Sequence, residues 1–319
     1  MNRPCEPGEM CEKKAGRIAA LGVFDGVHLG HRRILEEALR WAREDGVTAL
    51  AMTFSTHPDS VIQRTTPNLI VSMGRRVRIL ESLGFDAVLL LPFNEKISRI
   101  SAEKFARNFL ARGLGLTGIV VGPDFRFGHR ATGDVELLRE IGKAHGFGVH
   151  VLEPVLHENE VISSSRIRKL VESGDMEAAR SMLGRPFHLR GQVVLGQRRG
   201  RTIGFPTANL APEALLRPAI GVYATTLDRS NGQVLPAVTN VGVCPTFGGA
   251  APLTVETHVL DFEEDFYGEE VGVAFHKRLR GEMKFSSPVD LARQIRLDIS
   301  RAEELFSSNP SLTDTAGTL

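Results

Sequence analysis

The chain has 319 residues, enough for two domains, and is ordinary globular in composition, with 42% hydrophobic and 24% charged residues. Its net charge of +1 gives no reason to expect nucleic acid or an acidic membrane as the main partner. Only three cysteines occur, at Cys5, Cys11 and Cys244, which disfavours a disulfide framework or a thiolate zinc site. We expect a cytoplasmic protein, a monomer or weak homo-oligomer, with small-molecule partners.

The first half of the chain alternates short apolar runs with amphipathic stretches. Residues 1–14 form a polar leader without the apolar core of a signal peptide, and we expect it to be disordered. The apolar runs cover residues 17–24, 47–54, 85–93, 117–125 and 147–155, and the helical patterns cover 31–44, 74–84, 101–113 and 133–146. Near-continuous apolar strands between helices are typical of a parallel sheet covered on both faces. The alternation predicts a doubly wound α/β domain over residues 15–185.

Two histidines, His28 and His31, lie three residues apart in "GVFDGVHLGHRRIL", where the first predicted strand gives way to a helix. They could pack or cap the helix, bind zinc, or contact phosphate. A zinc site needs further ligands, and no second His-x-x-His, His-Glu-x-x-His or cysteine cluster supplies them. A helix N-terminus presents unpaired N–H groups, imidazoles can donate hydrogen bonds to phosphoryl oxygens, and the nearby glycines Gly22, Gly26 and Gly30 permit close approach.

A second polar segment, "ISSSRIR" at residues 162–168, follows the last apolar run and begins another predicted helix. Serines at a helix start are ordinary caps. Arg166 and Arg168, however, add cations suited to a polyphosphate. The segment therefore favours the phosphate interpretation of the two histidines.

The pattern changes after Pro186. Short alternating segments cover residues 188–196, 221–228, 233–243, 253–262 and 269–280, and one helical pattern follows at 289–306. Glycine, proline and asparagine separate the segments, which is typical of a small antiparallel β-barrel or sandwich. We predict a barrel domain with a terminal helix over residues 186–308 and a disordered tail over 309–319.

No Walker sequence occurs in the chain, but "GRTIGFPTANL" at residues 200–210 could cradle phosphates with its backbone N–H groups. As composition alone it is a turn followed by a strand. Thr207 and Asn209, two apart, would point the same way on a strand, and both offer oxygen ligands that Mg²⁺ accepts. Glu256 lies in an apolar strand, on the same face as Thr254 and His258. It could face solvent or act as a general base.

Taken in order, these motifs resemble one known enzyme family. "GVFDGVHLGH", "THPDSVI", "GPDFRFGHRATGD" and "ISSSRIR" are similar to the FMN adenylyltransferase module of the bacterial bifunctional riboflavin kinase/FAD synthetases. "GRTIGFPTANL", "TVETHVLDF", "DFYGEEVGVAF" and "LRGEMKF" resemble the riboflavin kinase module of the same family. The resemblance runs from about residue 17 to residue 306. It implies a nucleotidyltransferase fold for the first domain, with the kinase barrel second.

The resemblance implies that the barrel phosphorylates riboflavin to FMN and that the first domain adenylylates FMN to FAD, with ATP and Mg²⁺ in both steps. For adenylyl transfer it assigns catalysis to His28, His31 and Arg166, ATP binding to Gly22, Phe24, Asp25, Gly30, Ser164, Ser165 and Arg168, and flavin binding to His57, Pro58, Asp124 and Phe125. For the kinase it assigns ATP binding to Gly200, Thr202, Gly204 and Pro206, Mg²⁺ to Thr207 and Asn209, proton abstraction to Glu256 and flavin binding to Arg280.

Two positions depart from the family pattern, because Ser165 and Cys244 stand where the family usually has threonine and arginine. Two other interpretations stay open. The chain could be a flavin- or nucleotide-binding regulator that does not turn over its ligands. It could also be an enzyme with one working module.

Overall fold

The computed structural model describes residues 16–196, 200, 203–213, 216–243, 253–262, 264 and 266–313. The predictions for residues 1–14, Thr202 and Cys244 lie outside the described residues. By internal packing the chain divides into two compact units, Met1–Ser163 and Ser164–Leu319. This division falls before two helices that we place, by sequence, at the end of the first functional module.

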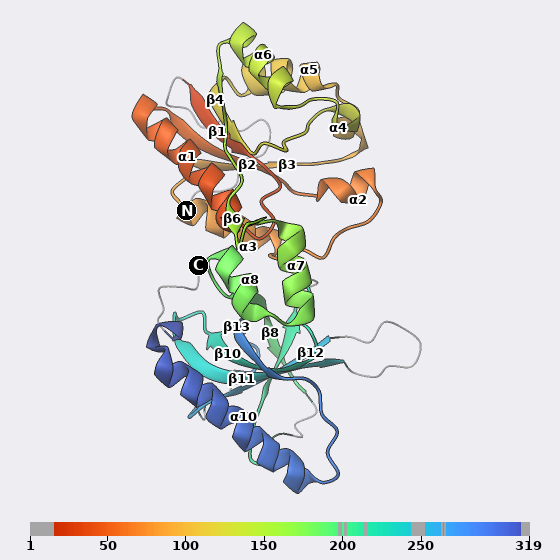
Figure 1. The fold of residues 1–319 in the computed structure, drawn as a ribbon, viewed down its shortest axis with the longest axis vertical. Helices are drawn as coiled ribbons and strands as arrows, with labels where there is room; N and C mark the ends of the chain where they lie inside the picture. Colours follow the sequence, from red (N-terminus) through yellow and green to blue (C-terminus); the bar gives the residue numbers. More distant parts are fainter. Residues whose placement is uncertain are drawn as a thin grey trace. The chain divides into compact units, whose positions relative to one another are not determined.

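The first unit is built on a parallel sheet of five strands in the order β3-β2-β1-β4-β5 (Figure 1). Its strands are β1 (Arg17–Leu21), β2 (Thr48–Phe54), β3 (Ala87–Leu91), β4 (Leu116–Val121) and β5 (Gly148–Val151). Each lies inside or within one residue of a predicted apolar run, since both faces of the sheet are covered. The doubly wound architecture is therefore confirmed.

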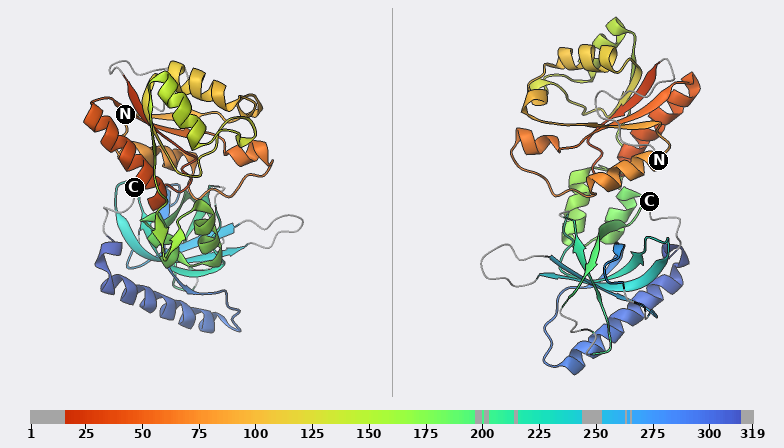
Figure 2. Two further views of the ribbon diagram at one scale, coloured as in Figure 1. Left: turned by 45° about the horizontal axis from the view of Figure 1, so that its top comes forward. Right: turned by 180° about the vertical axis from the view of Figure 1, so that it is seen from behind.

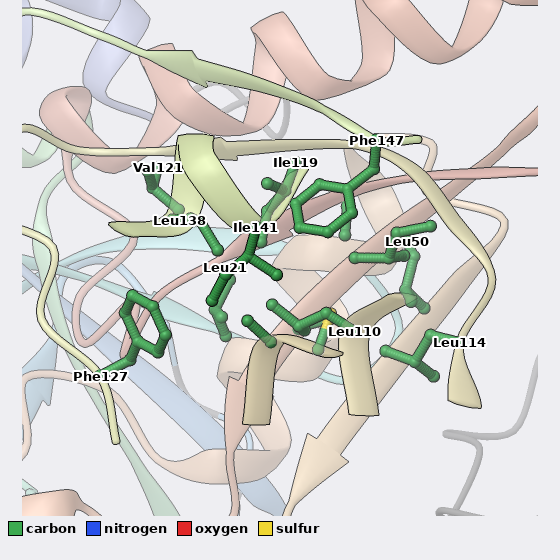
Figure 3. Packing of buried hydrophobic residues seen from close by; sticks show 14 of the residues in the cluster. Leu21, Leu50, Leu110, Leu114, Ile119, Val121, Phe127, Leu138, Ile141 and Phe147 are labelled. Atoms are coloured by element: carbon green, nitrogen blue, oxygen red, sulfur yellow. The ribbon is translucent and has the colours of Figure 1, made fainter. Parts of the chain in front are cut away.

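Helices cover both faces of this sheet and create two apolar cores. Helices α1 (Leu29–Asp45) and α3 (Met73–Ser82) pack on one face, while η1 (Phe105–Gly113) and α6 (Val135–His145) pack on the other. Figure 3 shows the second core, where Leu21 and Leu50 from the strands meet Leu110 from η1 and Ile141 from α6. The remaining short elements of the unit are α2 (Pro58–Ile62), α4 (Glu95–Ser98), α5 (Ala102–Lys104), η2 (His129–Ala131), β6 (Leu156–His157) and β7 (Glu160–Val161).

One helix differs from the ordinary helix predicted over residues 101–113. After the short α5, η1 is wound as a π-helix, and the N–H of Leu114 donates to the carbonyl of Phe109, 2.9 Å away and five residues back. The buried positions recur every fourth residue, at Ala102, Ala106, Leu110 and Leu114. An α-helix of 3.6 residues per turn would rotate such a stripe away from the sheet, and a wider turn keeps it in contact.

The order of the strands changes direction between β1 and β4. The chain leaves β1 toward β2 and β3 on one side, while β4 continues to β5 on the other. Loops after adjacent β1 and β4 therefore diverge, which is the usual place for a ligand in an open α/β sheet. The loop after β1 carries the two histidines, and the loop after β4 carries Asp124 and Phe125.

The second unit is a closed antiparallel barrel in the order β10-β11-β12-β9-β8-β13. Its strands are β8 (Phe187–Val194), β9 (Ala208–Pro212), β10 (Gly221–Asp228), β11 (Val234–Val243), β12 (Leu253–Val259) and β13 (Glu270–Arg280). The barrel and its terminal helix confirm the predicted fold of the second half.

Helices pack on the outside of the barrel. Helix α10 (Pro288–Ser308) lies along β10 and β11 in each view (Figures 1 and 2), burying Ala302 and Phe306 against the barrel wall. Helices α7 (Ser164–Ser173) and α8 (Met176–Leu183) contact each other, and α8 packs on β13 and β8. Leu312, in the short η3 (Pro310–Leu312) beyond α10, packs against the apolar cluster that contains Ala302 and Phe306. It lies within the tail that was predicted to be disordered.

A buried polar cluster lies in the barrel wall. Nε2 of His276 on β13 is 3.1 Å from the hydroxyl of Thr226 on β10, and the ring edge of His276 meets Phe306. Close by, Nε2 of His188 is 2.5 Å from a carboxylate oxygen of Asp228. Burial lowers the pKa of His276 to about 4, and the nearby positive charge of Arg180 acts in the same direction.

Because the pKa of folded His276 is lowered, we predict that the barrel loses stability in mild acid. Between about pH 6.5, where an unfolded histidine titrates, and pH 4, the unfolded chain binds a proton that folded His276 does not. The free energy of unfolding therefore falls as the pH drops through that window, by up to about 3 kcal/mol. The chain's two tyrosines, Tyr223 and Tyr267, are both in the barrel, and its one tryptophan, Trp41, is in the first unit. Urea unfolding followed by tyrosine near-UV dichroism measures the effect separately from Trp41 fluorescence.

The matched variant is His276→Asn, which keeps a polar partner for Thr226 but does not titrate. We expect it to flatten the pH dependence of barrel stability between pH 6.5 and pH 4. Asp228 and His188 face the same cluster and stay in place in this variant. An unchanged pH slope in the variant would contradict the assignment.

Candidate functional site

His28 begins the first helix of the α/β unit. It is the N-cap of α1, where its Nδ1 accepts the backbone N–H of His31 at 3.2 Å. The two imidazoles stack with centroids 3.5 Å apart and planes 17° from parallel. Because Nδ1 is an acceptor, the neutral form of His28 carries its proton on Nε2. His28 therefore caps the helix through Nδ1 and carries a hydrogen-bond donor at Nε2. Its role as a helix cap is compatible with a phosphate contact.

The turn that presents these rings is strained. Phe24 and Val27 have φ values of 50° and 41°, in a region that non-glycine residues rarely adopt, and both side chains are buried. Strain of this kind is held by surrounding structure and concentrates at functional sites. The ring of Phe24 stands edge-on to His31, with centroids 5.4 Å apart. The histidines are thus fixed by packing from below.

Two of the glycines make room for these rings. A Cβ atom at Gly22 would lie 2.8 Å from the ring of Phe24, and one at Gly30 would lie 3.1 Å from the ring of His28. From the sequence, we expected these positions to be glycine so that a nucleotide could approach the backbone closely. The structure adds a packing requirement, because neither ring could keep its place beside a side chain.

Asp25 supports the turn from inside the unit. Its carboxylate accepts the N–H of Ile70 at 3.0 Å and lies 3.9 Å from the guanidinium of Arg76. Arg76 is itself buried and donates to the carbonyl of Val23 at 2.9 Å. Burial lowers the pKa of Arg76, although the charge of Asp25 opposes that shift. Asp25 was predicted as an ATP contact, and the structure places its carboxylate against the backbone of Ile70 and the side chain of Arg76.

The predicted flavin residues follow other strands of the same sheet. His57, after β2, caps α2 as His28 caps α1, with Nδ1 accepting the N–H of Asp59 at 3.2 Å, and Pro58 occupies the first turn. Asp124, after β4, is exposed, and Phe125 beside it packs on Phe127 with centroids 5.5 Å apart. The structure brings these residues to the carboxyl edge of the sheet.

The segment "ISSSRIR" spans the division between the two packing units. The carbonyl oxygen of Ile162 would lie 3.6 Å from a Cβ atom at Gly30, so the chain passes beside the histidine turn just before α7 begins. Ser164, Ser165, Arg166 and Arg168 are in the first turns of α7, on the side of the division that contains the barrel. Of these, Ser165 is exposed and the others are half-buried.

In the barrel, Glu256 and Asn209 face each other across two strands. They are directly opposite in the antiparallel register of β12 and β9, so their Cβ atoms lie about 5 Å apart on one face. Val255, Thr257 and Val259 alternate with Glu256 and are buried, which places Glu256 on the opposite face, together with Thr254 and His258. On that face, Nδ1 of His258 lies 2.8 Å from the carbonyl of Pro206.

A pocket of about 340 Å³ opens beside this strand pair. Its lining consists of Val193, Val194, Leu195, Gly196, Pro206, Thr207, Ala208, Asn209, Thr257, Val259, Phe262, Glu264, Phe266 and Tyr267. Thr207 and Asn209 supply a hydroxyl and an amide oxygen there, the hard donors that Mg²⁺ accepts when substrate phosphates and water complete its shell. These residues therefore fit a magnesium–nucleotide site.

The segment before Thr207 and Asn209 folds as a tight turn. The carbonyl of Gly200 accepts the N–H groups of Ile203 at 3.1 Å and Phe205 at 2.9 Å, and Gly204 adopts a φ of 89°. Gly200 and Gly204 thus lie in a turn that leads into Thr207.

Sequence reasoning missed the other side of the pocket. Phe262, Phe266 and Tyr267 belong to "DFEEDFYG", between β12 and β13, where three aromatic residues stand among acids. Aromatic residues in a polar loop were a visible signal that they line a ligand site rather than a core.

Arg280, predicted as a flavin contact, is held by α10. Its guanidinium binds the buried carboxylate of Asp298, with Nε and Nη2 each 2.9 Å from Oδ2. Gln294 donates to the other oxygen of Asp298 at 2.9 Å. These contacts give Arg280 a role in fastening the terminal helix to β13.

Comparison with known proteins agrees with both halves of the structure. A FAD synthetase family model matches residues 10–166, and a riboflavin kinase model matches residues 183–306. The bifunctional riboflavin kinase/FMN adenylyltransferase of Bacillus subtilis is 36% identical, over 93% of this chain and 95% of its own. Its Escherichia coli counterpart is 34% identical, over 91% and 93%. The chain belongs to the bifunctional riboflavin kinase/FMN adenylyltransferase family.

A solved structure gives the same result for the fold. A protein titled macrolide-efflux protein, from Streptococcus pneumoniae, is 32% identical and superposes with a TM-score of 0.85, covering 92% of this chain and 95% of its own. In the part of the chain that the structure describes, no helix is both long and apolar enough to cross a bilayer. The same described residues contain no group of three or more His, Cys, Asp or Glu side chains that could hold a metal ion.

Gly196 offers a test of the magnesium–nucleotide site. A Cβ atom there would lie 2.2 Å from the amide nitrogen of Asn209. Because that amide can move, we expect Gly196→Ala to fold but to displace Asn209. The catalytic efficiency of riboflavin phosphorylation for ATP should fall at least about tenfold, while FMN adenylylation stays unchanged.

The control is Gly281→Ala, at a glycine in the same unit where a Cβ atom meets nothing closer than 3.7 Å. We expect it to leave both activities near the parent values. Equal losses in the two variants would show that Asn209 is not the affected group.

Proposed function

We propose that this bifunctional enzyme divides its two reactions between a module at residues 15–185 and a module at residues 186–308. The second phosphorylates riboflavin to FMN, and the first transfers AMP from ATP to FMN, giving FAD and pyrophosphate. The observation that carries the proposal is the pairing of Glu256 with Asn209 beside a pocket that also contains Thr207. A protein that only binds flavin or nucleotide has no need of a carboxylate at that place.

In the kinase module, Glu256 is the general base. It takes the proton of the riboflavin 5′-hydroxyl as that oxygen attacks the γ-phosphorus of ATP, and the bond to the β–γ bridging oxygen breaks to release ADP. Thr207 and Asn209 would hold Mg²⁺, which supplies neutralisation of phosphate charge when bound. The aromatic wall formed by Phe262, Phe266 and Tyr267 gives the adenine ring an apolar surface on which to stack.

In the adenylyltransferase module, catalysis rests on positioning and charge. A phosphate oxygen of FMN attacks the α-phosphorus of ATP, and the bond to the α–β bridging oxygen breaks to release pyrophosphate. His28 and His31 donate hydrogen bonds to the phosphoryl oxygens as charge develops there. Ser164, Ser165, Arg166 and Arg168 hold the triphosphate. No covalent intermediate with the protein is required.

The partners that follow from this function are small molecules: ATP, riboflavin and FMN. We propose a cytoplasmic enzyme, monomeric or weakly self-associating, that acts without nucleic acid. The direct test is incubation with riboflavin, ATP and Mg²⁺ followed by chromatographic separation of the flavins. Formation of FMN and then FAD is expected, and the absence of both would refute the function.

The histidine pair is tested by variants that preserve the helix cap. Asparagine is a good N-cap residue, so His28→Asn should keep α1 while removing the imidazole donor. We expect His28→Asn and His31→Gln each to reduce FAD formation by about 100-fold or more, with FMN accumulating at the parent rate. His145→Gln, at an exposed histidine in the last turn of α6, is the control. Undiminished FAD synthesis in folded His28→Asn would remove this residue from catalysis.

The general base is tested by Glu256→Gln, which keeps the shape of the side chain on β12. We expect riboflavin phosphorylation to slow by about 10²- to 10⁴-fold, while FAD synthesis from added FMN continues. The matched control is Glu270→Gln, at an exposed glutamate that begins β13. If Glu256→Gln still made FMN at the parent rate, another group would have to accept the proton.

A further inference from the structure

Arg229 lies where β10 turns into β11 and is a residue to which neither the motifs nor the family resemblance gave a role. Its backbone is fixed by the turn, since its N–H donates to the carbonyl of Gln233 at 2.9 Å and its carbonyl accepts from Gly232 at 3.0 Å. Its side chain is only 14% exposed. An arginine so placed has a defined backbone and a guanidinium directed at neighbouring structure.

That guanidinium binds two acids of the loop between β12 and β13. Nε and Nη2 contact the carboxylate of Glu269 at 3.2 and 2.8 Å, and Nη1 contacts Glu264 at 3.0 Å. Paired bonds from the planar guanidinium to one carboxylate fix direction as well as distance. The loop is therefore tied to β10 both at its middle and at its return into β13.

The same guanidinium lies over two aromatic rings. Its carbon is 5.6 Å from the centroid of Phe262 and 5.3 Å from that of Phe266, within the range of cation–π attraction. The two rings stack on each other at 4.9 Å. Phe262, Glu264 and Phe266 all line the pocket that contains Thr207 and Asn209. Arg229 thus contacts one wall of the pocket from behind.

The far end of the loop is fastened independently. Gly268 donates to the carbonyl of Val193 at 3.0 Å, and Val193 donates to the carbonyl of Glu269 at 2.9 Å, which ties the loop to β8. These backbone bonds hold the return of the loop but do not reach the two phenylalanine rings. Arg229 contacts the faces of both rings directly.

We propose that Arg229 is a positioning residue for the riboflavin kinase reaction, clamping the β12–β13 loop so that its aromatic side forms a wall for the nucleotide. This inference rests on the proposed function of the barrel. Lysine could supply the charge but not the paired bonds to Glu269. These contacts of Arg229 affect how tightly the nucleotide binds and do not alter the positions of Glu256 and Asn209.

The test compares Arg229→Met and Arg229→Lys with Arg190→Met in the full chain. Arg190 on β8 also pairs with an acid at the end of this loop, Glu270, at 3.7 Å. Glu270 is not in the pocket lining, whereas Phe262, Glu264 and Phe266, which Arg229 contacts, line the pocket. We expect Arg229→Met to raise the KM for ATP in riboflavin phosphorylation about tenfold, with kcat within about twofold of the parent. The KM of Arg229→Lys should lie between those of the parent and Arg229→Met, and the KM of Arg190→Met should equal that of the parent. The KM for ATP in FMN adenylylation should not change.

A double variant separates the clamp from a general effect on folding. If Arg229 acts through the rings, adding Phe266→Leu to Arg229→Met should raise the KM little beyond the larger single effect. Tyrosine near-UV dichroism shows whether the barrel of each variant is folded. If the barrel of Arg229→Met is not folded, the KM of Arg229→Lys is compared with that of the parent instead.

An unchanged KM in a folded Arg229 variant, an equal rise in Arg190→Met, or fully additive effects in the double variant would overturn the proposal. Failure of the parent chain to make FMN would refute the function of the barrel instead. The two failures are therefore distinguishable.

Discussion

The hydrogen-bonded register between strands is the constraint on which the barrel site depends. Because β9 and β12 pair with Asn209 opposite Glu256, a metal-binding type of side chain and a carboxylate are held about 5 Å apart by backbone bonds rather than by their own interactions. A shift of one residue in that register would turn one of them to the barrel interior. The barrel's closure fixes the register on both sides of each strand, since β9 also pairs with β8 and β12 with β11.

In the α/β unit the equivalent constraint is the start of a helix. His28 replaces the usual serine or aspartate of an N-cap, and its acceptor nitrogen satisfies one of the helix's unpaired N–H groups. The same bond selects the tautomer of the ring. His57 repeats the arrangement at α2. In both places the helix cap orients an imidazole at the carboxyl edge of the sheet. The same hydrogen bond therefore begins the helix and fixes the orientation of the ring.

The sequence was sufficient to predict the parallel sheet, the barrel, the histidine turn and the strand face that Glu256 shares with Thr254 and His258, because each has a local periodicity or spacing. It could not show that Asp25 accepts the N–H of Ile70 and lies beside Arg76, or that Arg280 binds Asp298, since these partners are distant in the chain. The letters of a motif do not show which other residues of the protein an acid or an arginine contacts. The aromatic wall was missed for a related reason, since only the fold brings Phe262, Phe266 and Tyr267 beside Thr207.

Three arginine–carboxylate contacts join loops or helices of this enzyme to its two sheets. Arg76 meets Asp25 beneath the histidine turn, Arg280 fastens α10 through Asp298, and Arg229 holds the β12–β13 loop through Glu269. Burying such a pair gains little net stability over an apolar pair, whereas removing one partner leaves a costly buried charge. Their benefit is therefore geometric. Arg76 and Arg280 also donate to backbone carbonyls, and Arg229 lies over aromatic rings. Each guanidinium can therefore hold a segment in one orientation where apolar packing alone would allow several.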